Sequence, residues 1–277
     1  MTETDELYLL ARRVLLDALD ALRAHVEAFI LVGAQAVYLR VGEGDLAIAP
    51  YTTDGDLAIE PARLAESPAL EAALKQADFR PKSKDSVGIW VTTRSTRARN
   101  PIDIGVDLLV PVSASPGSGR TAPLPGHDRR AARRVTGLDG ALVDFDVMEL
   151  GALEAGDDRR RPVRVAGPAA LLVAKAHKIS ERHGTGRQSD KDALDVLRLL
   201  RAVATDELAA RFKALLHDSR SAEAAMAGRE LLAAQFTSRA GVGIEMATRA
   251  VGPLADPEEI AASCQVLADE LLVRVAG

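Results

Sequence analysis

The N-terminal part of the chain changes from a helical pattern to a buried strand and back to a helix. Apolar side chains recur at three- and four-residue steps in residues 3–28, which predicts an amphipathic helix; they include Leu15, Leu19, Leu22 and Val26. The apolar run over residues 29–32 predicts a short buried strand. It stops at Gly33, and residues 34–40 return to helical composition. We therefore expect helix, strand, tight turn and helix in this order.

Two later strands are expected to carry acids on one face. Residues 54–59 end in an alternation with apolar side chains on one face and Asp54 and Asp56 on the other. In residues 102–110 every even position is apolar, and Asp107 lies on the opposite face. Shorter patterns predict a helix over residues 68–76 and strands over residues 87–92, 142–148 and 162–165.

The character of the chain changes near residue 167. The periodicity then predicts helices alone, over residues 168–182, 191–203, 207–217, 222–236, 243–250 and 257–275. Asp256 followed by Pro257 supplies the N-cap and first-turn proline of the last helix. We expect the α/β (α+β) class: a mixed sheet flanked by helices in a domain over residues 1–166, and a helical domain over residues 167–277.

Composition narrows the class of protein. The 277 residues are 47% hydrophobic and 27% charged, which excludes a wholly disordered or fibrous chain. The single Cys264 excludes an intrachain disulfide and a cysteine zinc cluster, and no signal-peptide pattern opens the sequence, so we expect a cytoplasmic protein. No apolar run reaches the roughly 18 residues of a membrane-spanning helix, so we expect no membrane partner.

The net charge of −5 requires that any nucleic-acid partner be bound by a local basic patch. The segment 111–140 is rich in Pro, Gly and Ser, and we expect it to be an exposed excursion from the core. It contains the densest basic cluster, Arg129, Arg130, Arg133 and Arg134; a second cluster lies at residues 159–161. Either cluster can also be an ordinary solvated surface.

The acids suggest metal chemistry. Asp54 and Asp56 project from one strand face, and Asp107 joins them if its strand lies alongside. Three such carboxylates attract hard cations such as Mg²⁺, which can activate a hydroxyl and neutralise a leaving pyrophosphate. The turn at Gly33 offers backbone N–H groups to phosphates. The alternatives are a helix-start glycine, a turn with a solvated acid, and Asp103 in place of Asp107.

Several runs together resemble a known superfamily. LVGAQAV, TTDGDLAI and GVDLLVP resemble the strand–turn–helix, the paired acids and the third acid of the DNA polymerase β-like nucleotidyltransferases. AGPAALLVAKAHKISER and KDALDVLRLL look like the lysine and Lys-Asp motifs of the AbiEii/MenT-type nucleotidyltransferase toxins in that superfamily. The resemblance extends from about Phe29 to about Leu200, most of the chain.

The resemblance implies roles for residues in the first domain. Gly33 and Ala34 would form the phosphate-binding turn. Asp54, Asp56 and Asp107 would be catalytic residues that bind Mg²⁺.

The resemblance also implies roles for residues in the helical domain. Lys175 would contact the nucleotide phosphates, with Lys178 as the alternative three residues later. Asp192 would complete the catalytic site, although it also stands where a helix-capping box with Ser189 would place it.

The implied activity is Mg²⁺-dependent transfer of a nucleoside monophosphate from an NTP to a hydroxyl, with release of pyrophosphate. The implied acceptor is a tRNA 3′ end, in a toxin controlled by a separately encoded antitoxin protein. A small-molecule acceptor, as in antibiotic-modifying relatives, is the second hypothesis. Two departures motivate a third, a degenerate nucleotide-binding domain: Ala34 lacks the usual hydroxyl or glycine, and Pro50 stands where an arginine often lies.

Overall fold

The computed structural model describes residues 3–42 and 52–277, which form two compact units. Unit 1 consists of Met1–Ala36, Ala49–Val135 and Asp146–Val165, and unit 2 consists of Val37–Ile48, Thr136–Phe145 and Ala166–Gly277. The last crossing between the units lies between Val165 and Ala166. The chain also enters unit 2 twice before that point, which the composition did not indicate.

The N-terminal elements follow the predicted order. They are α1 (Glu3–Ala21), a 3₁₀ helix (Arg23–Ala28), β1 (Phe29–Val32) and α2 (Gly33–Val41). The prediction of one helix over residues 3–28 was wrong in its last turns, because His25 has non-helical backbone angles (φ −120°, ψ 17°). Its ring instead lies 2.8 Å from the carbonyl oxygen of Pro68.

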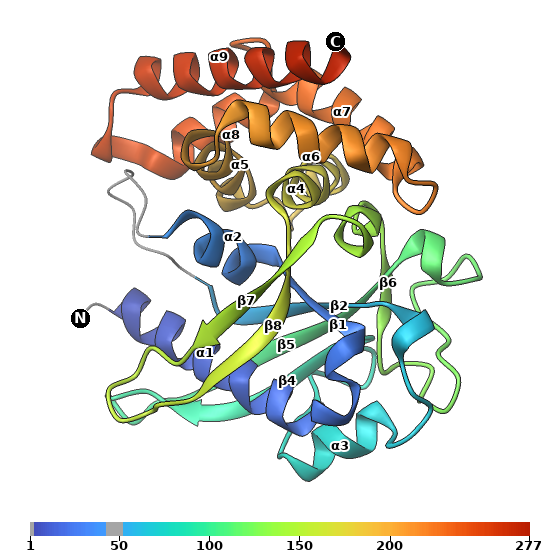
Figure 1. Ribbon diagram of the computed structural model, residues 1–277. Helices are drawn as coiled ribbons and strands as arrows, with labels where there is room; N and C mark the ends of the chain where they lie inside the picture. Colours follow the sequence, from blue (N-terminus) through green and yellow to red (C-terminus); the bar gives the residue numbers. More distant parts are fainter. Residues whose placement is uncertain (1–2, 43–51) are drawn as a thin grey trace. The chain divides into compact units, whose positions relative to one another are not determined.

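Unit 1 is built on a mixed sheet (Figure 1). Within the described residues the strand order is β3-β4-β5-β2-β1-β8-β7, with β6 paired to β5. β1 is antiparallel to β2, whereas β2 and β5 are parallel and so are β1 and β8. The remaining strands are β2 (Asp54–Ile59), β3 (Arg80–Pro81), β4 (Ile89–Ser95), β5 (Pro101–Pro111), β6 (Arg133–Val135), β7 (Phe145–Gly151) and β8 (Arg160–Ala166).

Helix α1 covers one face of this sheet. It packs on β2 and β5, and a Cβ built on Gly55 would lie 2.9 Å from Leu15 Cδ1. The apolar positions predicted for this face, such as Leu57 and Val106, are buried. Helix α3 (Leu70–Gln76) packs beside α1. Because side chains alternate along a strand, Asp54 and Asp56 face away from α1.

The segment 111–140 is the exposed excursion that its composition predicted only in part: most of residues 112–130 are exposed, whereas residues 131–140 are mostly buried. Ala122, Ala131 and Ala132 are fully buried, and Ala122 N–H donates to the carbonyl of Ala132 at 3.1 Å. Residues 133–135 form β6, which runs parallel to β5. Small side chains between the arginines let this segment pack closely on the sheet. The strand predicted over 142–148 begins later, at Phe145, because Asp139–Leu142 forms a buried 3₁₀ turn.

Unit 2 is helical in its described residues after Ala166. Helix α4 packs against α5, α6 and α7, and α9 packs against α5, α6, α7 and α8. The Asp256 side chain accepts a 2.9 Å hydrogen bond from Glu258 N–H, which confirms the predicted cap. The predicted class, a mixed sheet flanked by helices and followed by a helical region, is also confirmed. The helices are α4 (Pro168–Arg182), α5 (Asp190–Ala202), α6 (Thr205–His217), α7 (Ala222–Phe236), α8 (Val242–Val251) and α9 (Pro257–Ala276).

Candidate functional site

The three predicted acids lie together on neighbouring strands of unit 1. Asp56 pairs with Asp107 in the parallel register of β2 and β5, and Asp54 pairs with Gly105. Directly paired residues project from the same face of a sheet, so Asp54, Asp56 and Asp107 share the face opposite α1. A Cβ built on Gly105 would lie 3.7 Å from Asp54 Cβ, an ordinary contact distance, so these two positions are direct neighbours on this face. Asp107 is buried, whereas Asp54 and Asp56 are partly exposed.

The turn after β1 runs beside the same acids. Val32 pairs with Asp56, so the following residue, Gly33, passes next to the Asp56 carboxylate. Gly33 has a φ of +68°, in the left-handed region that favours glycine. Helix α2 begins at this residue, and Ala34 is buried in its first turn. The structure therefore brings the Gly33 turn and Asp56, which the sequence assigned to the phosphate and metal roles, side by side.

A buried polar chain ties this turn to the start of β2. Arg12 Nε donates to Gln35 Oε1 at 2.8 Å, and Gln35 Nε2 donates to the Asp54 carbonyl at 3.0 Å. Burial lowers the pKa of Arg12, partly offset by Tyr8. The Asp54 carboxylate itself accepts from Thr52 Oγ1 at 2.6 Å. The sequence pattern did not single out these residues; the available signal was a charged Arg12 with the apolar residues Leu9, Leu15 and Leu16 three and four positions away on the helix.

Asp107 has a cationic partner, Arg133, that was predicted to belong to the basic surface cluster at residues 129–134. Arg133 Nη2 lies 2.5 Å from Asp107 Oδ2, and both side chains are largely buried. The competing acid, Asp103, is exposed and accepts hydrogen bonds from Thr93 and Arg80. These bonds lower the pKa of Asp103. Asp103 therefore belongs to a surface ion pair on β5, two pleats away from the residue that pairs with Asp56.

The donor set suits a magnesium ion bound by two side chains. Among the described residues, no group of three or more His, Cys, Asp or Glu side chains is arranged to hold a metal. Mg²⁺ is commonly held by one or two carboxylates and completes its shell with water and substrate phosphates. Asp54 and Asp56, on one strand face and partly exposed, fit that requirement. Pro50, where the resemblance expects an arginine, lies outside the described residues.

Unit 2 contains the lysines and the remaining predicted acid in a buried ion cluster. Lys175 Nζ lies 2.8 Å from Asp192 Oδ1 and 2.7 Å from Asp195 Oδ2. Burial by itself lowers the pKa of Lys175, but the two carboxylates outweigh it and raise the pKa above its usual value. Burial likewise raises the pKa of Asp192, but Lys175 and Lys178 outweigh it and lower the pKa. The structure thus brings Lys175, Lys178 and Asp192 together within unit 2.

The accessible cations of this cluster are Lys178 and Arg182. Lys178 Nζ lies 3.0 Å from Asp192 Oδ1, and its side chain is 35% exposed against 4% for Lys175. Arg182 is 3.8 Å from the other Asp192 oxygen. Ser189 is the N-cap residue of α5, but its side chain makes no capping hydrogen bond. The capping-box alternative for Asp192 is therefore wrong, because its carboxylate is bound by the lysines.

The predicted arginine patch is divided. Arg133 faces Asp107, and the half-buried Arg134 donates to the carbonyl of Gly119. Arg129 is exposed, whereas Arg130 donates to the Ser86 carbonyl. In the second basic cluster, the arginines at 159–161 form ion pairs with acids on α1 and β7 and in the β7–β8 loop.

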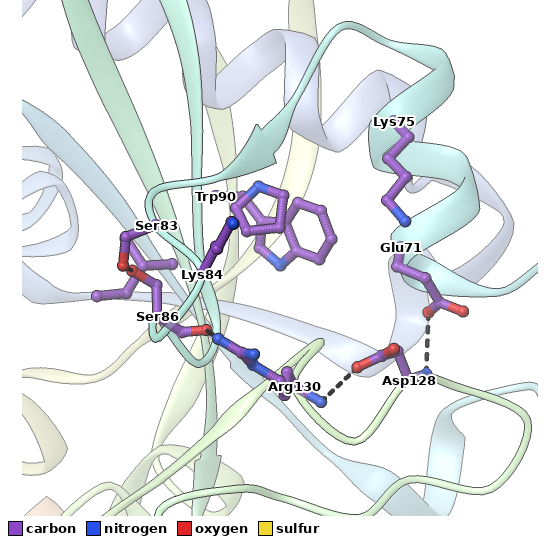
Figure 2. A pocket seen from close by; sticks show the side chains of 10 residues that line it. Glu71, Lys75, Ser83, Lys84, Ser86, Trp90, Asp128 and Arg130 are labelled. Atoms are coloured by element: carbon purple, nitrogen blue, oxygen red, sulfur yellow. Dashed lines mark hydrogen bonds between the residues drawn. The ribbon is translucent and has the colours of Figure 1, made fainter.

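Arg130 lines a cavity of about 570 Å³ in unit 1. Figure 2 shows Lys75 and Glu71 on α3 at one side, Lys84 on the turn between β3 and β4, and Asp128 and Arg130 at the base. Asp128 N–H donates to Glu71 Oε2 at 3.1 Å, which ties the arginine segment to α3. Among the described residues, Lys75 and Lys84 form no ion pair, so the cavity has a local excess of positive charge.

The chain is similar to a known protein at the level of structure but not of sequence. No model of a protein family matches the chain. No curated protein is significantly similar to it. Among solved structures, it is similar to an antigenic nucleotidyltransferase-like protein from Paracoccidioides brasiliensis, with 16% sequence identity and a TM-score of 0.45. The match covers 81% of this chain and 87% of the other.

Among the helices in residues 3–42 and 52–277, none combines the length and the apolar character needed to cross a membrane.

Proposed function

We propose that the protein is a Mg²⁺-dependent nucleotidyltransferase of the polymerase β-like superfamily, with its metal site in unit 1. The observation that carries the proposal is the register of β1, β2 and β5, in which Asp56 lies between the Gly33 turn and Asp107. Asp54 and Asp56 would hold Mg²⁺, which supplies charge neutralisation for the triphosphate and activates the acceptor hydroxyl. The α2 N-terminus presents backbone N–H groups suited to phosphate.

The proposed reaction is balanced without a further reagent. The acceptor hydroxyl oxygen forms a bond to the α-phosphorus of the NTP. The bond from that phosphorus to the bridging oxygen breaks, and pyrophosphate leaves with the electron pair. The hydroxyl proton passes to solvent.

The test is pyrophosphate release from each labelled NTP with total tRNA and Mg²⁺. Asp54→Asn and Asp56→Asn should each reduce release by orders of magnitude, because they keep side-chain size but remove a ligand charge. Asp103→Asn is the matched control, because this exposed acid lies on the same sheet face but is bound to Arg80. Release that survives both site substitutions would refute the metal assignment.

The acceptor in this proposal is the 3′ end of tRNA. The positively charged cavity at Lys75, Lys84 and Arg130 supports a phosphate-bearing acceptor, since phosphodiester groups bind to such local cations. Replacing all three with Ser should abolish transfer to tRNA and leave NTP binding unchanged. The slope of the logarithm of the RNA-binding constant against the logarithm of the salt concentration should become less steep by about 0.7 for each phosphate contact that is lost. An unchanged slope would favour a small-molecule acceptor.

The role as an AbiEii/MenT-type toxin with a separate antitoxin is the finer part of the proposal. It is supported by the sequence motifs that contain Lys175 and Asp192. Induced expression should arrest growth of a bacterial host, and Asp56→Asn should abolish the arrest. NTP binding without Mg²⁺ and without pyrophosphate release would instead favour a degenerate, non-catalytic domain.

A further inference from the structure

Arg133 lies on the same sheet face as the three acids. In the parallel register of β5 and β6, Arg133 pairs with Leu109, two residues after Asp107. Residues two apart on a strand share a face, and directly paired residues do as well. Arg133 and Asp107 therefore project from the same side of the sheet, and the guanidinium closes the 2.5 Å contact with Asp107 Oδ2.

The backbone around Arg133 is fixed from several sides. A Cβ built on Gly88 would lie 2.6 Å from the Arg133 backbone nitrogen, so β6 runs directly against this glycine. Gly88 N–H donates to the Arg130 carbonyl at 2.9 Å, and the buried Trp90 indole donates to the Ala131 carbonyl at 2.9 Å. Strand β6 is therefore held in place by these contacts, and it fixes the position from which the Arg133 side chain reaches the acids.

The guanidinium retains an unused donor. Arg133 Nε is buried and has no hydrogen-bond partner among the described residues. A buried donor without a partner is costly, and most such groups in folded proteins are satisfied by protein, water or ligand. The planar guanidinium donates to a carboxylate on one edge and can donate to phosphate oxygens with its other N–H groups.

Asp107 is neutralised by Arg133, whereas Asp54 and Asp56 are the two acids left to hold a metal ion. Asp107 is the neighbour of Asp56 by register, and like charges at this spacing repel unless a cation lies between or beside them. Arg133 supplies that cation for Asp107. Asp54 and Asp56 together already provide the number of carboxylates that Mg²⁺ commonly takes.

We propose that Arg133 binds a phosphate group of the NTP. In this proposal Asp107 is not a third metal ligand but a positioning residue, which orients the Arg133 guanidinium. This inference rests on the proposed nucleotidyltransferase function. Arg133 would donate hydrogen bonds to the phosphate oxygens on which negative charge develops as pyrophosphate leaves.

The test uses the full-length protein and two probes: Mn²⁺ alone, followed by electron paramagnetic resonance, and each NTP with Mg²⁺, followed by calorimetry. Arg133→Gln and Asp107→Asn should each weaken NTP binding by about tenfold to a hundredfold, the range for hydrogen bonds to charged groups. Neither should weaken Mn²⁺ binding. The variant that combines both substitutions should bind NTP as tightly as the single variant with the lower affinity. The reason is that Arg133→Gln and Asp107→Asn remove the same interaction.

Two further variants keep the result interpretable. Arg134→Gln is the matched control, since it is the next residue on β6 and alternates to the other face; NTP binding should not change. Arg133→Lys keeps the charge without the fork and should fall between Arg133→Gln and the native protein. Thermal unfolding of each variant identifies losses that arise from misfolding.

The inference is overturned if Asp107→Asn weakens Mn²⁺ binding as much as Asp56→Asn does. It is also overturned if the folded Arg133→Gln variant binds every NTP with native affinity. If the native protein binds Mn²⁺ and Asp56→Asn makes no difference, the proposed function itself fails. That outcome differs from one in which Asp56→Asn abolishes Mn²⁺ binding and only the Arg133 variants have no effect.

Discussion

Gly33 and Asp56 are in direct contact: a Cβ built on Gly33 would lie 2.0 Å from Asp56 Oδ2. The contact follows from the antiparallel pair Val32–Asp56, which brings the residue after β1 alongside the carboxylate. Gly33 also has a left-handed φ of +68°. Glycine is therefore required here for two separate reasons, the backbone conformation and the position of the acid.

Gly33→Ala should displace the Asp56 carboxylate and abolish Mn²⁺ binding. The conformational strain adds about 1–2 kcal/mol of destabilisation. Gly42→Ala is the matched control, because Gly42 follows the same helix with a φ of +63°, and a Cβ built on it would have no atom of the described residues within 4 Å. Urea unfolding should show a loss of stability in both variants, larger in Gly33→Ala because of the added clash with Asp56, and only Gly33→Ala should lose the metal. Equal Mn²⁺ affinities would contradict the contact.

Lys175→Met should destabilise unit 2 strongly. The substitution leaves Asp192 and Asp195 buried without their central cation, and breaking a buried pair in this way costs about 3–5 kcal/mol. Lys178→Met removes a partner that is 35% exposed and should cost about 1 kcal/mol or less. Urea unfolding measures both. Indistinguishable midpoints would show that the cluster does not stabilise the fold, and activity of Lys175 variants must be compared at equal folded fraction.

His127 should make the protein less stable in mild acid. Its Nδ1 accepts from Leu70 N–H at 3.1 Å at the start of α3, which requires the neutral ring. Burial lowers the pKa of His127, although the hydrogen bond to Ala65 partly opposes this. A lowered folded pKa means that the stabilisation is complete above the unfolded value, about 6.5, and is lost as the pH falls through the folded value.

The measurement for His127 is the urea midpoint between pH 7.5 and 5. The native midpoint should fall over this range by more than that of His127→Gln, which has no ring to protonate. Parallel pH profiles for the two proteins would rule out this linkage.

Cys264 should be chemically inert in the folded protein. Burial raises the pKa of its thiol to about 12, although Arg201 partly opposes this. Because the thiolate is the reactive form, iodoacetamide at pH 8 should modify the native chain far more slowly than the chain in urea. Mass spectrometry gives both rates. Rapid modification of the native protein would mean that α9 opens locally.

The sequence determined the elements whose pattern is local. The helices over 168–182 and 222–236 were predicted with the bounds that the structure has, because their apolar spacing repeats within a few residues. The same holds for β1 and β2, and for the shared face of Asp54 and Asp56, since alternation along one strand needs no partner. The cap at Asp256 is likewise a property of adjacent residues.

Only the tertiary structure decided which distant residues meet. Nothing in the pattern of 111–140 showed that its small residues would pack on β5 and direct Arg133 to Asp107. The two residues are 26 positions apart in the sequence, and only the pairing of β5 with β6 brings them together. The buried link from Arg12 through Gln35 to Asp54 has the same origin. Strand partners and buried ion pairs depend on which surfaces exclude water together, and the periodicity of a single segment contains no information about its partner.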